Sequence, residues 1–360
     1  MHILFVLEHY FPYIGGAEKL FKSLTESMVK EGFEVTVLTT KHDSIILSNE
    51  VIGGVNVVRL PFNNRFLFTF FSFPFLIKFV KKCDIVHTTS YNAAVPAFFA
   101  GKFCKKPVYI TFHEVWSGLW FNLPFYSFVH KIGYYLFEKM ILKLPFDKYI
   151  AVSEYTKKCL LESGIKESKI EQIYNAIDYE LIAQYQEQKT PKKHVFSYYG
   201  RLGASKGLDI LLGALLELKE EKVNFTCQLI IPQYPRSVYY EIIDIISKYE
   251  IIKHIEIYHE LSEKELYHRI QDSSFVVIPS YSEGFCFVAA ECSALQIPVV
   301  SSGKGALRET VSGKYIEMLD LTIKDLKAAL EKGISGEWCY KENRIFPMTE
   351  MIQSYLKVYS

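Results

Sequence analysis

The sequence predicts an α/β protein made of two doubly wound units, and three observations support this prediction. The chain has 360 residues, more than one ordinary hydrophobic core accommodates, so two domains are expected. Short β-branched or aromatic runs alternate with longer helical patterns in both halves, which is typical of parallel sheets covered by helices on both faces. A polar stretch, QEQKTPKKH at 186–194, separates the two series and is typical of a linker.

The individual elements follow from these patterns. In the first half, strands are predicted at 2–8, 34–40, 55–60, 84–89, 107–113 and 148–154. In the second half, strands are predicted at 194–202, 225–231, 254–261, 274–280, 298–302 and 314–319. Gly15 and Gly16 lead into a helix with apolar residues at helical spacing, which stops at Gly32. Such sheets bind ligands beyond the carboxyl ends of their strands, so a ligand is expected in a central cleft that the two domains face.

Composition limits the partners and the compartment. The chain has 41 basic and 40 acidic residues and no long basic run, so nucleic acid is not an expected partner. Seven cysteines form no C-x-x-C pair, which suits free thiols in a reducing compartment. The N-terminus has no basic leader, and no apolar segment reaches the roughly 20 residues of a spanning helix. We therefore expect a cytoplasmic protein.

Several nucleotide-binding motifs are missing from the sequence. Neither half has G-x-G-x-x-G followed by a correctly spaced acid, and G-x-x-x-x-G-K-[ST] is absent, which disfavours dinucleotide oxidoreduction and P-loop phosphotransfer. There is no D-x-D pair to hold a divalent metal on a diphosphate. We expect no metal site and no cofactor, so a bound phosphate would need side-chain cations and backbone amides.

Such cations occur in YYGRLGASKGLDILLGAL, where a strand ends and a helix begins. Gly200 allows close backbone approach, and Arg201 and Lys206 flank the turn. A guanidinium fork and a mobile ammonium group at a helix N-terminus are suited to a diphosphate. The alternative is a surface turn with two solvated cations.

Two carboxylates stand eight residues apart in the mostly apolar stretch PSYSEGFCFVAAECSALQIPVV. If 285–296 is a helix, Glu291 has apolar neighbours one turn away on either side, so it needs a polar partner, and a ligand is one candidate. Glu283 is expected at the rim, where it could accept hydrogen bonds from sugar hydroxyls. The alternative for both residues is a helix cap or a buried polar network.

Together these features resemble glycosyltransferase family 4, which comprises retaining nucleotide-sugar transferases of the GT-B fold. The resemblance covers nearly the whole chain and depends on the order of its motifs. They are G-R-x4-K-G with Arg201 and Lys206, Glu283 followed by Gly-Phe, Glu291, Glu309 in LRETV, GGAE at 15–18, HTTS at 87–90, FHE at 112–114, AVSEYTKKCLLESGI at 151–165 and YNAID at 174–178. The domains are expected at 1–188 and 189–342, and the resemblance implies that a C-terminal helix at 343–360 returns to the first domain.

The resemblance also implies roles for individual residues. The implied catalytic group is His113, Arg201, Lys206 and Glu283. Arg201 and Lys206 would hold the donor diphosphate, Glu283 the donor sugar and Glu291 the ribose. The remaining implied donor-binding residues are Gly15, Gly16, Gly200, Gly284, Phe285 and Cys286, and the implied acceptor-side residues are Glu18, Glu114 and Asn175. A satisfied core histidine is the alternative for His113.

The implied activity is metal-independent, retaining transfer of a hexose from a UDP- or GDP-linked sugar to a hydroxyl of a saccharide or lipid-linked saccharide, in cell-surface polysaccharide or glycolipid synthesis. The alternatives are a GT-B nucleotide-sugar epimerase or hydrolase and a non-catalytic sugar-binding partner subunit. The chain departs from the family at Cys286 and Gln296, where glycine is common, and at Gly305-Ala306, where the family has a glycine pair. Cys286 could crowd the phosphates.

Two aromatic segments leave a membrane surface open as a further partner. Residues 66–80 contain seven phenylalanines in fifteen positions, and 119–146 combines aromatic residues with Lys131, Lys139 and Lys143. One interpretation is peripheral docking on the inner face of a membrane, with rings at the lipid boundary and lysines at the headgroups. The other is that both segments pack in the first core.

Overall fold

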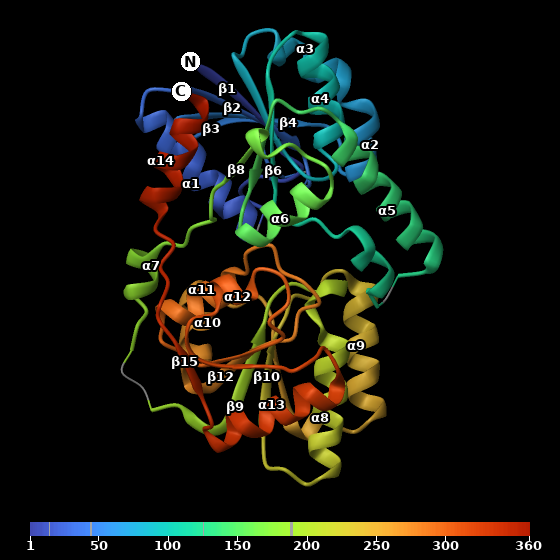
Figure 1. Ribbon diagram of the computed structural model, residues 1–360, viewed down its shortest axis with the longest axis vertical. Coiled ribbons are helices and arrows are strands. Elements are labelled where there is room, and N and C mark those ends of the chain that lie inside the picture. The colour runs from blue at the N-terminus through green and yellow to red at the C-terminus, as the bar shows by residue number, and fades with distance from the viewer. Residues whose placement is uncertain (14, 44, 125, 188–189) are drawn as a thin grey trace. The chain divides into compact units, whose positions relative to one another are not determined.

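The computed structural model describes residues 1–13, 15–43, 45–124, 126–187 and 190–360. It has two compact units. Unit 1 consists of Met1–Ser117, Ile132–Ala176 and Met348–Ser360, and unit 2 consists of Gly118–Lys131 and Ile177–Pro347. The predicted boundary at 188/189 lies outside the described residues. Each unit contains one mainly parallel sheet covered by helices, so the predicted doubly wound α/β class is confirmed (Figure 1).

Unit 1 contains an eight-stranded sheet in the order β3-β4-β2-β1-β5-β6-β7-β8. Its strands are β1 (His2–Val6), β2 (Glu34–Thr40), β3 (Asn49–Ile52), β4 (Val55–Leu60), β5 (Ile85–Thr89), β6 (Val108–Phe112), β7 (Lys148–Ala151) and β8 (Ile170–Gln172). Only β3 pairs antiparallel among the described strands of this sheet. The chain order reverses between β1 and β5, where Val6 aligns with Thr88. This reversal is the point where such sheets bind ligands.

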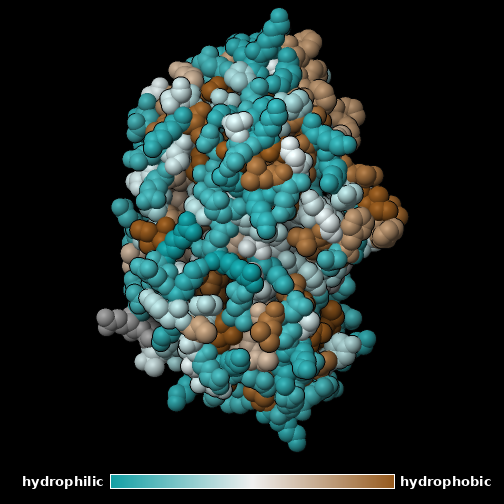
Figure 2. All heavy atoms as spheres, viewed as in Figure 1, coloured by the Kyte–Doolittle hydropathy of each residue, from teal (hydrophilic) through white to brown (hydrophobic). Residues whose placement is uncertain are grey.

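Helices cover both faces of this sheet. They are α1 (Gly16–Lys30), α2 (Arg65–Phe71), α3 (Phe73–Val80), α4 (Ala94–Phe103), α6 (Glu154–Glu162) and α14 (Met348–Tyr359), with the 3-10 turn η2 (Glu167–Lys169). The 3-10 turn η1 (Ser117–Asn122) belongs to unit 2 except for Ser117. A further helix, α5 (Phe128–Lys143), runs across the division between the units. The phenylalanine-rich segment forms two helices and not one, because Pro74 occupies the first turn of α3 and lacks the amide that would continue α2. Apolar side chains are visible at the molecular edge over α2 and α3 (Figure 2).

The C-terminal helix α14 belongs to unit 1 and contributes to a buried polar network. His87 on β5 contacts the Tyr359 hydroxyl through Nδ1 and Thr111 Oγ1 through Nε2, the latter at 2.8 Å. The Tyr355 hydroxyl lies 3.2 Å from the same Thr111 oxygen. Burial, together with the neighbouring His113, lowers the pKa of His87 to about 3. The ring is therefore neutral, and its two nitrogens help to anchor α14.

Unit 2 contains a seven-stranded sheet in the order β11-β10-β9-β12-β13-β14-β15. Its strands are β9 (Lys192–Tyr199), β10 (Thr226–Ile230), β11 (Ile255–Tyr258), β12 (Ser273–Ile278), β13 (Val299–Ser301), β14 (Gly313–Glu317) and the antiparallel β15 (Cys339–Lys341). Its helices are α7 (Tyr179–Ala183), α8 (Leu208–Glu220), α9 (Arg236–Lys248), α10 (Glu263–Asp272), α11 (Phe287–Ala294), α12 (Leu307–Thr310) and α13 (Ile323–Ser335), with η3 (Ala204–Lys206) and η4 (Ile252–His254). The chain order reverses between the neighbours β9 and β12.

Each of the twelve predicted strands overlaps an observed one, and three short strands were not predicted. Two of these, β3 and β15, are antiparallel edge strands with exposed residues, and β8 has three residues. Edge strands that face water on one or both sides lack the apolar run on which the prediction depended. The helix considered at 285–296 is shorter and corresponds to α11.

Two further expectations concern thiols and membrane spans. All seven cysteines are free, as expected. Within the described ranges, no helix combines the length and apolar character needed to cross a membrane.

Candidate functional site

The order reversal in unit 2 brings together residues from two separate predicted motifs. Strand β9 ends at Tyr199 and continues into Gly200 and Arg201, whereas β12 ends at Ile278 and continues into the loop that carries Glu283. The two strands are parallel neighbours, so both loops leave the sheet at the same edge. A hydrogen bond of 2.7 Å from the Tyr281 amide to the Ser205 carbonyl joins the loops directly.

Lys206 and Glu283 form an ion pair at this edge. The Lys206 ammonium group lies 2.8 Å from Oε1 and 2.9 Å from Oε2 of Glu283. The Ser280 hydroxyl donates a further hydrogen bond of 2.7 Å to Oε1. Glu283 is only 6% exposed, so the expectation that it lies at a rim was wrong. Its burial is compensated by the cation and the hydroxyl.

Arg201 differs from Lys206 in its surroundings. Its side chain is exposed, and no residue in the described part of the chain forms an ion pair or side-chain hydrogen bond with it. The turn between the two cations ends at Gly207, which has a φ of +68°. A Cβ atom at Gly207 would lie 1.9 Å from the Pro279 carbonyl oxygen, so only glycine lets the two loops approach this closely.

The backbone of Glu283 is held by a third loop. The Ala306 amide donates a hydrogen bond of 2.8 Å to the Glu283 carbonyl. A Cβ atom at Gly305 would lie 2.4 Å from the same carbonyl oxygen, so this glycine is also required by close approach. Gly284 and Phe285 follow as buried residues, and the Phe285 ring packs edge-on against Phe346 with centroids 5.0 Å apart. The position of the Glu283 carboxylate is therefore defined by packing on several sides.

Cys286 lies in a backbone conformation that favours glycine. It is buried, immediately precedes α11, and has φ and ψ angles of 74° and 86°. Burial and the nearby Glu283 carboxylate raise the pKa of its thiol well above the usual value, so the thiol is protonated at neutral pH. Gln296 has a φ of 57° just after α11. Both departures from the family pattern therefore place a side chain on a left-handed residue, which is strained.

Glu291 has protein partners of its own. Its Oε2 accepts a hydrogen bond of 2.8 Å from the Tyr199 hydroxyl, and its Oε1 accepts a longer one of 3.4 Å from Tyr267. The expected polar partners are thus two tyrosine hydroxyls, which the sequence prediction missed. Burial is the largest cause that raises the pKa of Tyr199 well above its usual value, and the neighbouring Cys292 and Glu291 raise it further. The phenol therefore keeps its proton and can donate it in a hydrogen bond to Glu291.

The neighbouring Tyr198 occupies the other face of β9 and was also missed. Its hydroxyl is buried without a hydrogen-bond partner among the described residues. Burial raises the pKa of this phenol, and the neighbouring Glu283 and Cys286 raise it further. A Tyr-Tyr pair at the end of a buried strand is the signal that could have identified both hydroxyls.

In unit 1, the predicted glycines lie where β1 leads into α1. Gly15 is the N-terminal cap of α1 and has an extended backbone. Glu18 in the first turn curls back toward Gly15, since a Cβ atom there would lie 2.1 Å from a Glu18 carboxylate oxygen. Gly16 begins the helix. A carboxylate in the first turn is favourable because it faces the unpaired amides of the helix N-terminus.

His113 and Glu114 follow β6 in a loop that is held by a buried carboxylate. Glu138 on α5 is fully buried and accepts hydrogen bonds from the Trp116 and Ser117 amides at 2.8 and 2.6 Å. It also accepts a hydrogen bond of 2.8 Å from the Tyr91 hydroxyl, which lies 3.1 Å from the Glu114 carbonyl. Glu138 and Tyr91 therefore position this loop, and neither was predicted.

His113 and Asn175 are the remaining candidate residues of unit 1. The His113 ring is half-buried and lies edge-on to Phe21 of α1, with centroids 5.8 Å apart. This contact brings the β6 loop next to the helix that begins at Gly16. Asn175 is buried after β8, and its Oδ1 has no hydrogen-bond partner within the described ranges.

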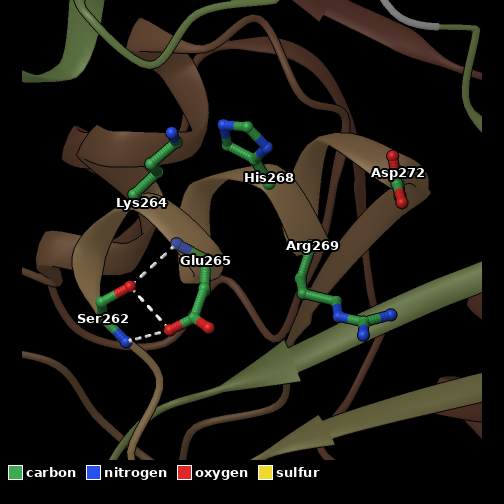
Figure 3. A pocket seen from close by; sticks show the side chains of 6 residues that line it. All are labelled: Ser262, Lys264, Glu265, His268, Arg269 and Asp272. Carbon is green, nitrogen blue, oxygen red and sulfur yellow. Dashed lines mark hydrogen bonds between the residues drawn. The ribbon is translucent and has the colours of Figure 1, made fainter.

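A shallow hollow on α10 contains none of the predicted site residues (Figure 3). It is lined by Ser262, Lys264, Glu265, His268, Arg269 and Asp272. Ser262 and Glu265 make the reciprocal hydrogen bonds of a helix capping box, which explains their arrangement. Arg269 stacks on Tyr258 at 4.1 Å. These contacts stabilise the helix, and we place no site here.

Two family models match the chain. The model described as Glycosyltransferase Family 4 matches residues 14–181, and the model described as Glycosyl transferases group 1 matches residues 182–337. Among curated relatives, an uncharacterized glycosyltransferase of Methanocaldococcus jannaschii is 25% identical over 86% of this chain and 83% of its own length. A phosphatidylinositol N-acetylglucosaminyltransferase component of Homo sapiens is 22% identical, covering 92% of this chain and 68% of its own.

Solved structures show the same fold. A sucrose-phosphate synthase from Thermosynechococcus elongatus is similar with a TM-score of 0.77 and 18% identity, covering 99% of this chain and 98% of its own. Anabaena HepE in complex with UDP and glucose is similar with a TM-score of 0.75 and 15% identity, covering 99% of this chain and 98% of its own. The chain therefore has the GT-B fold, with two doubly wound α/β units. Since its two parts match the two family models in order, the chain belongs to glycosyltransferase family 4.

Proposed function

We propose that this protein transfers a hexose from a UDP- or GDP-linked sugar to a hydroxyl of a saccharide or lipid-linked saccharide, with retention of the anomeric configuration and without a metal ion. The observation that carries the proposal is the Lys206–Glu283 pair beside the exposed Arg201 at the order reversal of the unit 2 sheet. Two cations and a carboxylate at this edge suit a nucleotide diphosphate sugar. The cations suit its phosphates, and the carboxylate suits the hydroxyls of its sugar.

The chemistry of the proposal follows from charge. Breaking the bond between the sugar and the diphosphate develops negative charge on the departing group. Arg201 and Lys206 would stabilise that charge, because they are cations at the edge where such sheets bind ligands. Glu283 would accept hydrogen bonds from sugar hydroxyls in exchange for part of its contact with Lys206. Lys206 could then turn toward the diphosphate without leaving the carboxylate unsatisfied.

Residues of the first unit would serve the acceptor side. His113 and Glu114 lie in the loop after β6 that Glu138 holds, and Gly15, Gly16 and Glu18 lie at the start of α1. We propose that His113 lies near the reacting carbon and that Glu18, Glu114 and Asn175 contact the acceptor. In unit 2 we propose that Glu291, oriented by Tyr199, accepts hydrogen bonds from the ribose hydroxyls.

The names of similar proteins support this class of donor and acceptor. HepE has been solved with UDP and glucose, and a similar structure with a TM-score of 0.67 is a lipopolysaccharide outer core galactosyltransferase. The human relative is part of a phosphatidylinositol N-acetylglucosaminyltransferase. We therefore favour cell-surface polysaccharide or glycolipid synthesis as the setting, with a cytoplasmic enzyme.

A thermal-shift screen with UDP-, GDP- and ADP-linked hexoses tests donor binding, because a ligand that binds only the folded state raises the melting temperature. We expect a UDP- or GDP-sugar to produce the largest shift. Turnover is then measured as nucleotide release with and without a saccharide acceptor. Release only with acceptor supports transfer, release without acceptor supports a hydrolase, and no binding of any nucleotide sugar supports a non-catalytic role.

The stereochemistry and the metal requirement have separate tests. The anomeric configuration of the product, read by proton NMR, is expected to match that of the donor. Activity is expected to persist in EDTA. Inversion at the anomeric carbon would contradict retention, and loss of activity in EDTA that is restored by a divalent metal would contradict a metal-independent mechanism.

A further inference from the structure

Three neighbouring helices of unit 1 expose an unusual number of large apolar side chains. On α2, α3 and α4 these are Phe66, Leu67, Phe70, Phe71, Phe75, Phe99 and Phe103. Phe70 is 72% exposed and Phe103 is 67% exposed. The helices pack together, and the rings of Phe73 and Phe103 meet with centroids 6.1 Å apart. We refer to these seven residues as the aromatic face.

The aromatic face is distinct from the core that the same helices supply. Phe68, Leu76 and Val80 point inward and are fully buried. One side of each helix in segment 66–80 therefore packs in the core of unit 1, and the other side is exposed. A single exposed phenylalanine needs no explanation, but several on adjoining helices indicate an interaction surface.

Charge around the aromatic face is strongly one-sided. Residues 61–106 contain seven basic side chains and a single acidic one, Asp84, whereas the whole chain is balanced at 41 to 40. Arg65 and Lys102 pair with Glu8 and Asp147. The remaining basic side chains form no ion pair within the described part of the chain, and they are Lys78, Lys81, Lys82, Lys105 and Lys106. Lys81 and Lys82 precede β5, and Lys105 and Lys106 precede its neighbour β6, so both pairs lie at the same edge of the sheet. Asp84 accepts a hydrogen bond from the His2 amide.

We propose that the aromatic face binds the surface of an anionic lipid bilayer. Phenylalanine rings would enter the boundary between headgroups and acyl chains, while the flanking lysines contact anionic headgroups. A second copy of the chain is a poorer occupant because it would bring two lysine-rich surfaces together. Lysine is also depleted at interfaces between proteins, which favours lipid over a protein partner.

Docking through this face would place the bilayer beside the candidate acceptor edge of unit 1. Arg65 at the start of α2 lies 3.1 Å from Glu8, which follows β1. The Thr69 hydroxyl on α2 donates a hydrogen bond of 2.9 Å to the Asn92 carbonyl after β5. The aromatic face therefore extends to the carboxyl ends of β1 and β5. The inference stands apart from the proposed transfer, because lipid binding is measured without donor or acceptor.

The test is flotation of the full-length protein with vesicles of phosphatidylcholine alone or of phosphatidylcholine with phosphatidylglycerol. We expect binding to the anionic vesicles only, weakened by added salt. The variants Phe70→Ser/Phe71→Ser and Lys78→Glu/Lys81→Glu should each bind at least tenfold more weakly. Matched controls in unit 2, Leu319→Ser for exposed apolar area and Lys253→Glu/Lys264→Glu for charge, should bind as the unchanged protein does.

Several results would overturn the proposal. One is failure of the unchanged protein to bind anionic vesicles at low salt. Another is binding of the two face variants to anionic vesicles as strong as that of the unchanged protein. If Phe70→Ser/Phe71→Ser instead converts a dimer into a monomer in light scattering while vesicles are not bound, the aromatic face is an interface between copies. We expect the face variants to keep the donor-induced thermal shift. A variant that loses both this shift and lipid binding is misfolded, and the test is then repeated with Phe75→Ser and Phe103→Ser.

Discussion

Lys206 and Glu283, which lie 77 residues apart in the sequence, meet as an ion pair with both carboxylate oxygens within 2.9 Å of the ammonium nitrogen. The pair has two possible contributions, one to stability and one to the proposed reaction. Because Glu283 is buried, removal of Lys206 alone would change both properties, so a single variant cannot separate them.

A double-mutant cycle separates the two contributions. Lys206→Ala should lower the free energy of unfolding by about 2 kcal/mol, because it leaves a buried carboxylate without its cation. Lys206→Ala/Glu283→Gln should recover most of that loss. Turnover should fall by about two to three orders of magnitude in both variants if these side chains contact the donor.

The measurements are urea denaturation and nucleotide release with acceptor. Lys158→Ala, which removes the cation of an exposed pair with Glu162, is the control and should change stability by less than about 1 kcal/mol. Recovery of activity together with stability in the double variant would show that the pair is only structural.

The backbone at Cys286 predicts an unusual order of stability. Cys286→Gly should be more stable than Cys286→Ala by about 1 kcal/mol, because glycine adopts a φ of 74° without steric strain and alanine does not. Both variants lose the same thiol, so the comparison isolates the backbone. Chemical denaturation measures the difference.

Cys292 provides the matched control for this comparison. It is buried within α11, where the order should reverse, with Cys292→Ala more stable than Cys292→Gly by about 1 kcal/mol. Equal stability of glycine and alanine at position 286 would contradict the strained conformation. A rise in donor affinity in Cys286→Gly would additionally indicate that the thiol crowds the phosphates.

Acid should destabilise unit 1 through His87. Its pKa is about 3 in the folded protein against an ordinary value of 6.5, so between these values the unfolded chain binds a proton that the folded chain does not. The free energy of unfolding should therefore decrease as pH falls below 6.5, with a His87 contribution of up to about 1.4 kcal/mol per pH unit. Urea denaturation across this range measures the slope.

The variant His87→Gln should show a shallower dependence on pH, because it lacks the titrating ring. His130→Gln, which replaces an exposed histidine, is the matched control. An identical slope in His87→Gln and in the unchanged protein would mean that burial does not protect His87 from protons.

Removal of the Glu138 carboxylate should loosen the loop that carries His113. Glu138→Ala leaves the Trp116 and Ser117 amides buried without an acceptor and should cost about 3 kcal/mol in the free energy of unfolding. Glu138→Gln keeps one acceptor oxygen and should cost less. The exposed Glu162→Ala should change stability by no more than about 0.5 kcal/mol.

Kinetics then test whether this loop serves the proposed reaction. If His113 acts near the reacting carbon, Glu138→Gln should lower kcat more than it raises KM for the donor. An unchanged kcat in a folded Glu138→Gln protein would indicate that the loop has a structural role only.

Much of the fold could be predicted from local patterns. The strand β2 was predicted with its observed bounds because a buried parallel strand is a continuous β-branched run. The edge strand β15 has three exposed residues and no such pattern, so it was missed. The break between α2 and α3 could have been predicted from Pro74, since proline ends a helix for a local steric reason.

The candidate site shows the same division. Arg201, Lys206, Glu283 and Glu291 were singled out because charged residues interrupt apolar strand ends and because of their family spacing. Their partners were not predicted. Tyr199 supplies the hydroxyl that Glu291 needs from a strand 92 residues away, and no local pattern encodes that contact.

The sequence by itself determined the α/β class, the strand positions and the residue types at the strand ends, because these depend on hydrophobic periodicity and on chemistry within a few neighbours. Only the tertiary structure decided that β9 and β12 are adjacent, that Lys206 neutralises a buried Glu283, and that the aromatic residues of α2, α3 and α4 have one side in the core and one in water. The physical reason is that burial and ion pairing are set by which distant segments pack together, and sheet order is a property of the whole folded unit.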